Sequence, residues 1–389
     1  MNCGQSQRAT VCAMNPAMHV SSRRSFLHQF ALGSAALAFG AAASRSEEMS
    51  PLKTPAKRSL GVALMGLGGY SAGELAPALQ TTRHCHLAGV ITGDPAKGRA
   101  WSRRYGFPEK NIYTYDTVQH CATNADIDII YVVTPPGLHR DHVLAAARAG
   151  KHVICEKPMA VSVAGCDEMI AACRAAGVKL SIGYRLAFEP HHLELDRLAR
   201  TRAWGVFKKI AGSNGFRLRR RTWRVDKKLA GGGPLMDMGI YVIQAAVRAA
   251  AGATPVAVAA HELPKTDAKL FNEVEESLRF RLEFPEGEVC EGATSYAENS
   301  GDFRAEAEKG WIAFSPAFSY RGVSARTQEG PLDVPKNVPQ QALQMDDFAA
   351  CILNQRATPV PGEMGRQHLA IIEAIYEAAR SGRRVNVRA

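Results

Sequence analysis

The sequence has no apolar run long enough to span a membrane, no CxxC pair and few aromatic residues (7%). The apolar run at 30–43 is short and rich in Ala and Gly, so no stable membrane anchor is expected. Basic side chains do not interleave with aromatic ones, and no zinc-finger or RNA-binding signature occurs, so nucleic acid is not an expected partner. No spacing suits a metal ion either, and His191-His192 is expected on a loop surface.

Cysteine usage argues against a disulfide framework. Cys3 and Cys12 lie in the N-terminal segment 1–43, and the seven cysteines that follow it are odd in number and lie mostly in apolar runs. A chain that folds in the reducing cytoplasm would not depend on disulfides. The formal charge of +11 falls to +8 without residues 1–43, which hold three arginines and no acid (11 − 3 = 8). This moderately basic balance suits a solvated surface and phosphate-bearing ligands.

The N-terminal segment is typical of a twin-arginine export signal. Residues 22–27 read Ser-Arg-Arg-Ser-Phe-Leu, and the apolar run at 30–43 ends in three alanines. We therefore expect a cleaved signal over 1–43, recognition by the twin-arginine translocation machinery and a periplasmic location. That route exports folded proteins, which suits a protein that must capture a cytoplasmic nucleotide before it leaves. Residues 44–58 are polar, with Pro51 and Pro55, and are expected to form an extended arm.

Two domains are expected after the arm. In residues 59–183, short continuous apolar runs alternate with amphipathic segments, which predicts a Rossmann-type doubly wound parallel sheet. The expected strands of this sheet are 60–65, 87–91, 127–133 and 152–155.

Residues 184–389 predict an α+β domain with an open, mostly antiparallel sheet and helices on one face. Its expected strands are 256–261, 277–284 and 289–296, and its expected helices are 235–250, 341–353 and 366–380. The fold class is therefore α/β.

A glycine-rich turn follows the first expected strand and reads Gly66-Leu67-Gly68-Gly69-Tyr70-Ser71. The first glycine permits the tight turn, the second lets the backbone approach a pyrophosphate, and the following helix points its N-terminus at the anion. Ser71 occupies the third glycine position, a small residue but a departure from the pattern. The place of this turn between a strand and a helix predicts a dinucleotide site.

The end of the second strand bears on the choice between NAD and NADP. Thr92 stands where an acid would bind a ribose 2′-hydroxyl, and Lys97 follows within reach. A carboxylate would repel a 2′-phosphate, whereas a hydroxyl and an ammonium would hold one, so NADP is favoured. If the ribose-binding position lies two residues further along the chain, Asp94 is the ribose ligand, and NAD is then the alternative cofactor.

Three further segments carry the catalytic prediction. Residues 134–139 read Thr-Pro-Pro-Gly-Leu-His, residues 150–158 read Gly-Lys-His-Val-Ile-Cys-Glu-Lys-Pro, and residues 231–241 read Gly-Gly-Gly-Pro-Leu-Met-Asp-Met-Gly-Ile-Tyr. Asp237 and Tyr241 are four apart and would share one helix face. Together with the glycine turn, these segments resemble the glucose–fructose oxidoreductase/inositol dehydrogenase (Gfo/Idh/MocA) family from residue 60 to the C-terminus. Tyr241, where most members have His, is similar to the glucose–fructose oxidoreductase branch.

The resemblance implies that Lys157 and Tyr241 line the reacting hydroxyl, with Asp237 beside them. The ammonium of Lys157 would lower the phenol pKa from its usual value near 10, so that Tyr241 could act as the base. Two features depart from the family. Pro136 stands where the family usually has Asn. The arm before residue 60 is short, and this leaves open whether NADP is held permanently. The cofactor contacts implied by the motifs and the resemblance are Gly66, Leu67, Gly68, Tyr70, Thr92, Lys97, Thr134, His139, Glu156, Lys157, Arg185, Trp223 and Arg224.

The expected activity is oxidation of C1 of an aldose by NADP, with the hydride passed on to a second sugar. A simple dissociable NAD(P)-dependent sugar dehydrogenase or reductase is the first alternative. An NAD-dependent glycosidase of the same family is the second, although residues 237–241 lack the histidine of that group, and a non-catalytic nucleotide-binding module is the third. The resemblance also implies a homodimer or homotetramer joined through the sheet of the second domain.

Overall fold

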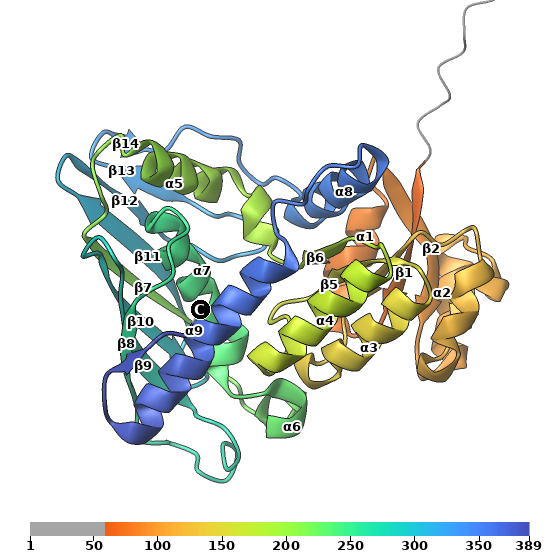
Figure 1. Cartoon of the computed structure of the whole chain (residues 1–389), viewed down its shortest axis with the longest axis horizontal. Helices are drawn as coiled ribbons and strands as arrows, with labels where there is room; N and C mark the ends of the chain where they lie inside the picture. The colour runs from red at the N-terminus through yellow and green to blue at the C-terminus, as the bar shows by residue number, and fades with distance from the viewer. Residues whose placement is uncertain (1–58, 389) are drawn as a thin grey trace, which may run out of the picture. The chain divides into compact units, whose positions relative to one another are not determined.

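The computed structural model describes residues 59–388 (Figure 1). The expected export signal (1–43) and arm (44–58) lie outside the described residues. Among residues 59–388, no helix has the length and apolar character needed to cross a bilayer.

The first part of the described chain is a parallel sheet flanked by helices (Figure 1). Its six strands lie in the order β3-β2-β1-β4-β5-β6, and each neighbouring pair runs parallel. The strands are β1 (Leu60–Met65), β2 (Cys85–Ile91), β3 (Ile112–Tyr113), β4 (Ile129–Val132), β5 (His152–Cys155) and β6 (Leu180–Ile182). The helices and helical turns between them are η1 (Ser71–Leu75), α1 (Ala76–Leu79), α2 (Pro95–Tyr105), η2 (Glu109–Asn111), η3 (Tyr115–Thr123), α3 (Pro136–Arg148) and α4 (Val163–Ala175).

Both faces of this sheet are covered, which explains why its strands are continuously apolar. Along β1, Ala63 and Met65 join one hydrophobic core, whereas Val62 and Leu64 join another. Successive side chains of a strand point to opposite faces, so every residue of a doubly covered strand must be apolar. The structure therefore confirms the doubly wound parallel sheet expected from the sequence.

The second part is built on a nine-stranded sheet in the order β14-β13-β12-β11-β7-β10-β9-β8-β15. Only β7 and β10 pair in parallel, and the other neighbouring pairs are antiparallel. This result confirms the mostly antiparallel sheet. The strands are β7 (Lys209–Gly215), β8 (Ala257–Glu262), β9 (Ser277–Glu283), β10 (Val289–Ser295), β11 (Ser300–Ala307), β12 (Gly310–Phe314), β13 (Ala325–Thr327), β14 (Gly330–Pro331) and β15 (Val385–Asn386).

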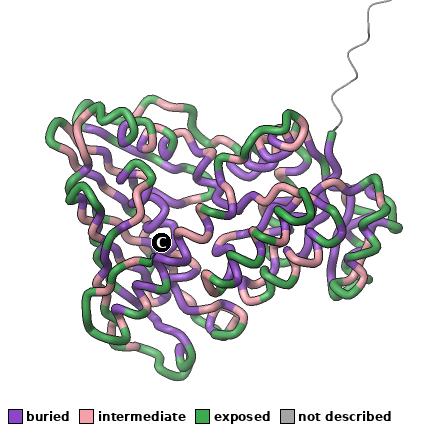
Figure 2. The backbone as a smooth tube through the Cα atoms, viewed as in Figure 1, coloured by how far each residue is buried: buried purple, intermediate pink, exposed green. Residues whose placement is uncertain are grey.

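Helices cover one face of the second sheet. Helix α7 packs on β7, while α9 packs on β8 and also reaches α4 and β6 of the first part (Figure 1). Strands β9 and β10 largely alternate buried with less buried residues. Figure 2 shows buried stretches in the interior of the molecule and exposed stretches along its outline. The helices and helical turns are η4 (Arg185–Phe188), α5 (Pro190–Thr201), η5 (Trp223–Val225), α6 (Lys227–Ala230), η6 (Leu235–Gly239), α7 (Ile240–Ala249), α8 (Gln340–Leu353) and α9 (Gly362–Ser381).

Helix α8 returns to the first sheet although it comes late in the chain. Its residues Met345 and Phe348 are buried in the same core as Val62 and Leu64 of β1. Asp346 of α8 accepts hydrogen bonds from the backbone N–H groups of Arg83 and His84. Packing between the two parts is therefore continuous across position 183, where the sequence analysis divides the chain.

The paired histidines are buried, so their expected place on a loop surface is wrong. His191 and His192 lie in the first turn of α5, each 1% exposed. His191 Nδ1 lies 2.7 Å from a Glu189 carboxylate oxygen, and His192 Nε2 lies 2.9 Å from the Ala317 carbonyl oxygen. Burial lowers the pKa of His192 to about 4, so this ring is neutral and packs as a core residue.

The seven cysteines of the described chain are free thiols, and all are buried. No cluster of three or more metal-ligating side chains occurs among residues 59–388.

Candidate active site

Three loops meet at the carboxyl edge of the parallel sheet, because β1, β4 and β5 are neighbours in it. The glycine turn follows β1, Thr134 follows β4 and Glu156 follows β5. In an open parallel sheet, ligands bind in the crevice outside the carboxyl ends of the strands. The topology therefore brings the expected nucleotide and catalytic segments to one edge.

The glycine turn has the backbone that close approach to a phosphate requires. Gly66 has φ +100°, a conformation that favours glycine, and a Cβ there would lie 3.0 Å from the Val133 carbonyl oxygen. At Gly68 no atom of the described chain lies within 4 Å of where a Cβ would be, so the outer side of the turn is open. Ser71 donates its hydroxyl proton to the Gly66 carbonyl oxygen at 2.6 Å, which gives this departure from the glycine pattern a physical reason.

Lys97 lies against the glycine turn. Its ammonium donates to the Leu67 carbonyl oxygen at 2.5 Å, which places a positive charge beside the expected phosphate position. Thr92 is buried at the end of β2, and its hydroxyl accepts from the Asp94 N–H at 3.2 Å. Asp94 caps α2 by accepting from the Lys97 N–H at 3.1 Å. A hydroxyl and an ammonium at this position fit a ribose 2′-phosphate, while Asp94 is engaged by its own helix.

Thr134 and His139 tie together the loops after β4 and β5. His139 is 1% exposed; its Nε2 lies 2.7 Å from the Thr134 carbonyl oxygen and its Nδ1 lies 3.0 Å from the Pro158 carbonyl oxygen. Burial lowers the pKa of this imidazole to about 4. The structure thus gives His139 a positioning role behind Lys157, and direct contact of His139 with a cofactor stays a prediction.

Lys157 and Asp237 form the centre of the site. The Lys157 ammonium donates to the Asp237 backbone carbonyl oxygen at 2.7 Å and lies 3.3 Å from its carboxylate. Burial opposes charge on Lys157, but Tyr241, Asp237 and the Glu156 carboxyl outweigh it and raise the ammonium pKa. Lys157 therefore holds a permanent positive charge at the end of β5.

Asp237 has two further partners. Its second carboxylate oxygen accepts from Arg224 Nε at 2.7 Å and from the Tyr296 hydroxyl at 3.2 Å. Burial opposes ionisation, yet Lys157 and Arg224 together lower the Asp237 pKa to about 2. The Arg224 guanidinium also lies 4.5 Å from the Trp223 ring centre, so the pair expected at the cofactor is anchored to the Asp237 carboxylate.

Tyr241 lies between two cations. The Lys157 ammonium is 4.6 Å from the centre of its ring, and the Arg185 guanidinium carbon is 5.1 Å from it. The ring is 7% exposed and also packs on Phe318 at 6.0 Å between ring centres. The structure therefore brings the three expected catalytic residues, Lys157, Asp237 and Tyr241, within contact of one another.

Glu156 lies behind Lys157 and contacts its backbone. Its carboxylate accepts from the Tyr131 hydroxyl at 2.7 Å and from the Lys157 backbone N–H at 3.2 Å, whereas the Lys157 ammonium is held by Asp237. Gln344 of α8 donates to Tyr131 at 2.7 Å and so directs the tyrosine proton towards Glu156. Burial raises the Glu156 pKa. Glu156 thus fixes the backbone of Lys157 rather than its side chain.

Arg185 connects the site to a loop that the sequence analysis missed. Its guanidinium donates to the carbonyl oxygens of Phe318 at 2.5 Å and Ser319 at 3.0 Å. It also lies 4.4 Å from the ring centre of Tyr320, which in turn lies 5.6 Å from the Tyr70 ring of the glycine turn. The only feature of the sequence that could have indicated this loop is its pair of aromatic residues between Pro316 and Gly322.

Arg321 and Glu74 join this loop to the helical turn that follows the glycine turn. Their side chains form an ion pair at 3.2 Å. Residues 318–321 therefore reach from the second part of the chain across the mouth of the expected nucleotide site.

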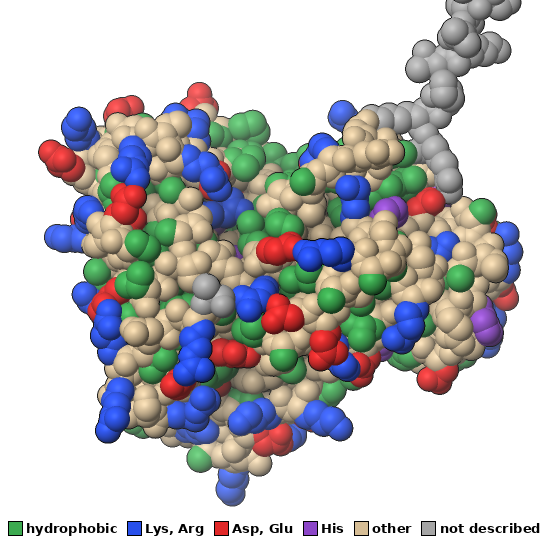
Figure 3. Space-filling view, viewed as in Figure 1, with side chains coloured by type: hydrophobic (Ala, Val, Ile, Leu, Met, Phe, Trp, Pro, Cys, Tyr) green, Lys and Arg blue, Asp and Glu red, His purple; other side chains and the backbone are tan. Residues whose placement is uncertain are grey.

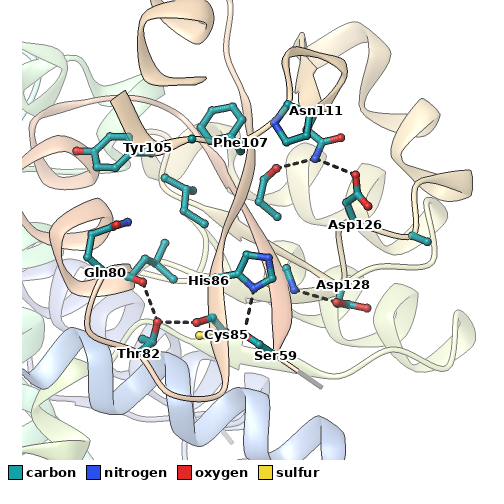
Figure 4. Close-up of a pocket in the computed structure, with 17 residues that line it drawn as sticks. Ser59, Gln80, Thr82, Cys85, His86, Tyr105, Phe107, Asn111, Asp126 and Asp128 are labelled. Atoms are coloured by element: carbon teal, nitrogen blue, oxygen red, sulfur yellow. Dashed lines mark hydrogen bonds between the residues drawn. The ribbon is translucent and has the colours of Figure 1, made fainter. Parts of the chain in front are cut away.

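A cavity of about 670 Å³ lies elsewhere, at the amino ends of β1 and β2 (Figure 4). Several of its polar groups have partners within the chain: Asn111 donates to the Asp126 carboxylate at 3.3 Å, and His86 Nδ1 lies 3.0 Å from the Ser59 hydroxyl. Because nucleotides bind at the carboxyl edge of such a sheet, this cavity is separate from the candidate site.

The described residues fit a dinucleotide with a 2′-phosphate. The open side of Gly68, the ammonium of Lys97 and the hydroxyl of Thr92 lie on one side of the site, and Lys157, Asp237 and Tyr241 lie on the other. When bound, the nicotinamide of such a cofactor would supply hydride transfer beside these three residues.

Comparison with known families and proteins gives matches along most of the described chain. Residues 60–184 match the oxidoreductase family with an NAD-binding Rossmann fold, residues 192–313 match the GFO/IDH/MocA C-terminal domain, and residues 323–387 match the C-terminal alpha/beta domain of the oxidoreductase family. A solved aldose-aldose oxidoreductase from Caulobacter crescentus is 42% identical, with a TM-score of 0.81, over 85% of this chain and 100% of that one.

Curated proteins match over a similar length. D-xylose 1-dehydrogenase (NADP(+)) 2 of Haloferax volcanii is 27% identical over 337 residues, which are 83% of this chain and 98% of that protein. D-glucoside 3-dehydrogenase of Escherichia coli is 27% identical over 84% of this chain and 97% of its own length.

Proposed function

The chain belongs to the Gfo/Idh/MocA oxidoreductase family, and on that premise we propose that it oxidises C1 of an aldose with NADP and passes the hydride to a second sugar. The observation that carries this proposal is the set formed by Lys157, Asp237 and Tyr241 at the carboxyl edge of the parallel sheet. Its relatives include NADP-dependent sugar dehydrogenases, which supports an oxidoreductase acting on CH–OH groups of sugars.

The chain's own residues supply the proton chemistry. Oxidation of a sugar hydroxyl releases one proton and one hydride, and NADP⁺ held at Gly68 and Lys97 would supply the hydride acceptor. Tyr241 is the base that takes the hydroxyl proton on its phenol oxygen, and the nearby Lys157 ammonium stabilises the negative charge that develops on the oxygens. Asp237 keeps Lys157 in place and charged, and Arg224 and Tyr296 hold Asp237.

Selection of NADP over NAD rests on the end of β2. Lys97 faces the glycine turn and Thr92 follows the strand, so a 2′-phosphate would meet an ammonium and a hydroxyl. The similarity of the chain to two NADP(+)-dependent D-xylose 1-dehydrogenases supports the same choice of cofactor.

Transfer to a second sugar is supported by the aldose-aldose oxidoreductase that is 42% identical over its whole length. The first aldose would lose one hydride and one proton to become a lactone, which water would open to the aldonate. The second aldose would gain one hydride and one proton to become a polyol. The similarity to D-xylose 1-dehydrogenase favours a second candidate, a simple dehydrogenase that exchanges its cofactor with solution.

Export remains part of the proposal through the Arg-Arg motif at 23–24. The twin-arginine machinery would carry the folded protein with its nucleotide to the periplasm. A nucleotide that stays bound would need a second sugar to regenerate it there, which links the export signal to the two-sugar reaction.

The outer face of the second sheet is proposed to join copies of the chain into a dimer or tetramer. Exposed Arg and Glu side chains alternate on this face, with ion pairs between Arg281 and Glu291 and between Arg304 and Glu306. Such a pattern is complementary to a second copy of itself related by a two-fold axis.

The decisive experiment mixes the purified protein with two aldoses and adds no nucleotide. We expect an aldonate from one sugar and a polyol from the other in equal amounts, measured by chromatography. Lys157→Met and Tyr241→Phe should each lower the rate about 10²–10⁴-fold, the usual contribution of acid–base groups, while the melting temperature shows that both variants fold.

Two outcomes decide between the candidates. Protein that lacks bound nucleotide and oxidises sugars only with continual added NADP⁺ is the simple dehydrogenase. Protein that oxidises no aldose with or without NADP⁺ contradicts the assigned activity itself.

A further inference from the structure

A second cavity, of about 460 Å³, lies between α5, α7 and α9. Its walls are partly apolar, with Leu193, Val247 and Met364, and its charged groups come from α5 and α7. An apolar cavity with a few converging polar groups is the usual form of a small-molecule site. The glycine turn and Lys157 do not line this cavity, so it is distinct from the candidate active site.

Arg248 is the main charged group of this cavity. It is partly buried on α7, and among residues 59–388 its guanidinium takes part in no ion pair or side-chain hydrogen bond. The carboxylate of Asp196, also in the wall, is already paired with Arg200 at 2.7 Å. Burial, together with the nearby charge of Arg200, lowers the Arg248 pKa to about 10. Buried charges are normally paired, so a guanidinium in this position calls for an anion.

The groups behind Arg248 do not supply that anion. His192 and His368 lie close to it, and burial lowers their pKa values to about 4 and about 3, so both rings are neutral. Glu189 is engaged by His191 and by the His192 backbone N–H. The carboxylates of Asp196 and Glu189 favour the charge on Arg248, but neither forms an ion pair with it among residues 59–388, so its guanidinium is free to bind an anion in the cavity.

Gln244 adds a second unsatisfied donor, one helical turn before Arg248 on the same face of α7. The side chain is 2% exposed and lines the cavity, and its Nε2 has no hydrogen-bond partner within the described chain. A buried amide left unpaired costs about 1–3 kcal/mol, so an acceptor is expected nearby. Two donors without acceptors thus converge on one cavity.

We propose that this cavity is a binding site for a small organic carboxylate, held by Arg248 with help from Gln244. Its wall holds two guanidinium groups and one carboxylate, a net charge of +1 (2 − 1 = 1), which matches a singly charged anion better than a phosphate dianion. A guanidinium also matches the two oxygens of a carboxylate geometrically. This site requires no particular reaction at Lys157 and Tyr241. Because gluconate is also an aldonate of the kind expected as product of the proposed function, the effect of Arg248→Met is the result that separates the two sites.

The test measures binding of gluconate and of its neutral amide, gluconamide, to the purified full chain by isothermal titration calorimetry. Both probes present the same hydroxyl groups, so any difference between them reports the carboxylate. We expect gluconate to bind at least about tenfold more tightly than gluconamide, because one charge-assisted hydrogen bond contributes about that much affinity. Arg248→Met should reduce gluconate to the affinity of gluconamide, whereas Arg103→Met, at an exposed arginine of α2, should leave it unchanged.

Several results would overturn the proposal. These are equal affinities for the two probes, a gluconate affinity that Arg248→Met leaves unchanged, and tighter binding of inorganic phosphate than of gluconate. If Arg248→Met does not fold, Gln244→Leu decides the question. A several-fold loss of gluconate affinity in that variant supports the site, and an unchanged affinity contradicts it.

Discussion

Asp237 holds three partners at once, and each partner comes from a different segment. Lys157 follows β5, Arg224 lies in η5 and Tyr296 follows β10. A single carboxylate therefore keeps two cations apart and fixes the position of both. Removal of Asp237 would leave the charges of Lys157 and Arg224 buried without a partner. Asp237 is therefore expected to matter for folding as well as for the proposed catalysis.

The lowered pKa of Asp237 gives a prediction for stability against pH. The folded-state pKa is about 2, below the ordinary value of about 3.9, so ionisation stabilises the fold above about pH 4 and that stability is lost as the pH falls towards 2. The loss is on the order of 2 kcal/mol. Denaturant unfolding at pH 5 and pH 3 should show Asp237→Asn less stable than wild type at pH 5 and the difference smaller at pH 3.

A matched control for this prediction is Asp333→Asn, at an exposed aspartate in a loop. It should follow wild type at both pH values. A constant difference between wild type and Asp237→Asn from pH 5 to pH 3 would contradict the ionised Asp237 described here.

Residues of the site could be predicted in part. Lys157, Asp237 and Tyr241 lie in compact motifs, so local sequence was enough to single them out. Tyr320 and Arg321 were missed because their loop reaches the glycine turn only through long-range packing of the second sheet. Glu156 was placed at the site, but its hydrogen bond from Tyr131 depends on the register of β4 against β5, which the sequence does not state.

The glycine turn is the element where fold and ligand binding can be separated. A Cβ at Gly68 would meet no atom of the described chain, so Gly68→Ala should change the free energy of unfolding by less than about 0.5 kcal/mol. The same methyl group would stand where the backbone must approach a pyrophosphate. We therefore expect the Kd for NADP, measured by fluorescence titration of apoprotein, to rise at least about tenfold.

Gly73→Ala is the control within the same segment. Gly73 lies in η1, and a Cβ there also meets no neighbouring atom, but it is not part of the turn. It should alter neither stability nor NADP affinity by much. If Gly68→Ala binds NADP as tightly as Gly73→Ala does, the turn is not the phosphate site.

The elements that could be predicted were those with a clear local pattern. The ranges 60–65 and 152–155 agree with β1 and β5 because a short, continuously apolar run bounded by polar residues is typical of a buried parallel strand.

Strand β7 was missed because its sequence, Lys-Ile-Ala-Gly-Ser-Asn-Gly, is polar and rich in glycine. Gly212 is needed there because a Cβ would lie 2.9 Å from Val242 of α7. The helix expected over 235–250 is interrupted by the π-helical turn η6 before α7 begins.

At the scale of the whole molecule, the second sheet has one face under helices, and its other face is the one proposed to meet a second copy of the chain. Figure 3 shows basic side chains gathered with acidic ones where this part of the chain reaches the surface. Arg281 pairs with both Glu283 and Glu291. Reversal of its charge would therefore place it beside two carboxylates of its own chain, and at the proposed interface also beside carboxylates of the second copy.

We predict that Arg281→Glu combined with Arg304→Glu converts the proposed dimer or tetramer into monomers. Sedimentation velocity at equal protein concentration should show the change, because like charges facing each other across an interface cost several kcal/mol. Arg103→Glu, on α2 of the first part, should leave the sedimentation coefficient as in wild type. An unchanged coefficient in the double variant would place the interface elsewhere.

The burial of the seven described thiols has a consequence for the lifetime of the protein. Burial raises the pKa of Cys85 to about 12 and that of Cys121 to about 11, and Cys155 and Cys290 are raised as well. Oxidants and disulfide exchange attack the thiolate, which is scarce at such pKa values and is shielded here by packing. The folded chain can therefore pass from a reducing to an oxidising compartment with its covalent structure unchanged.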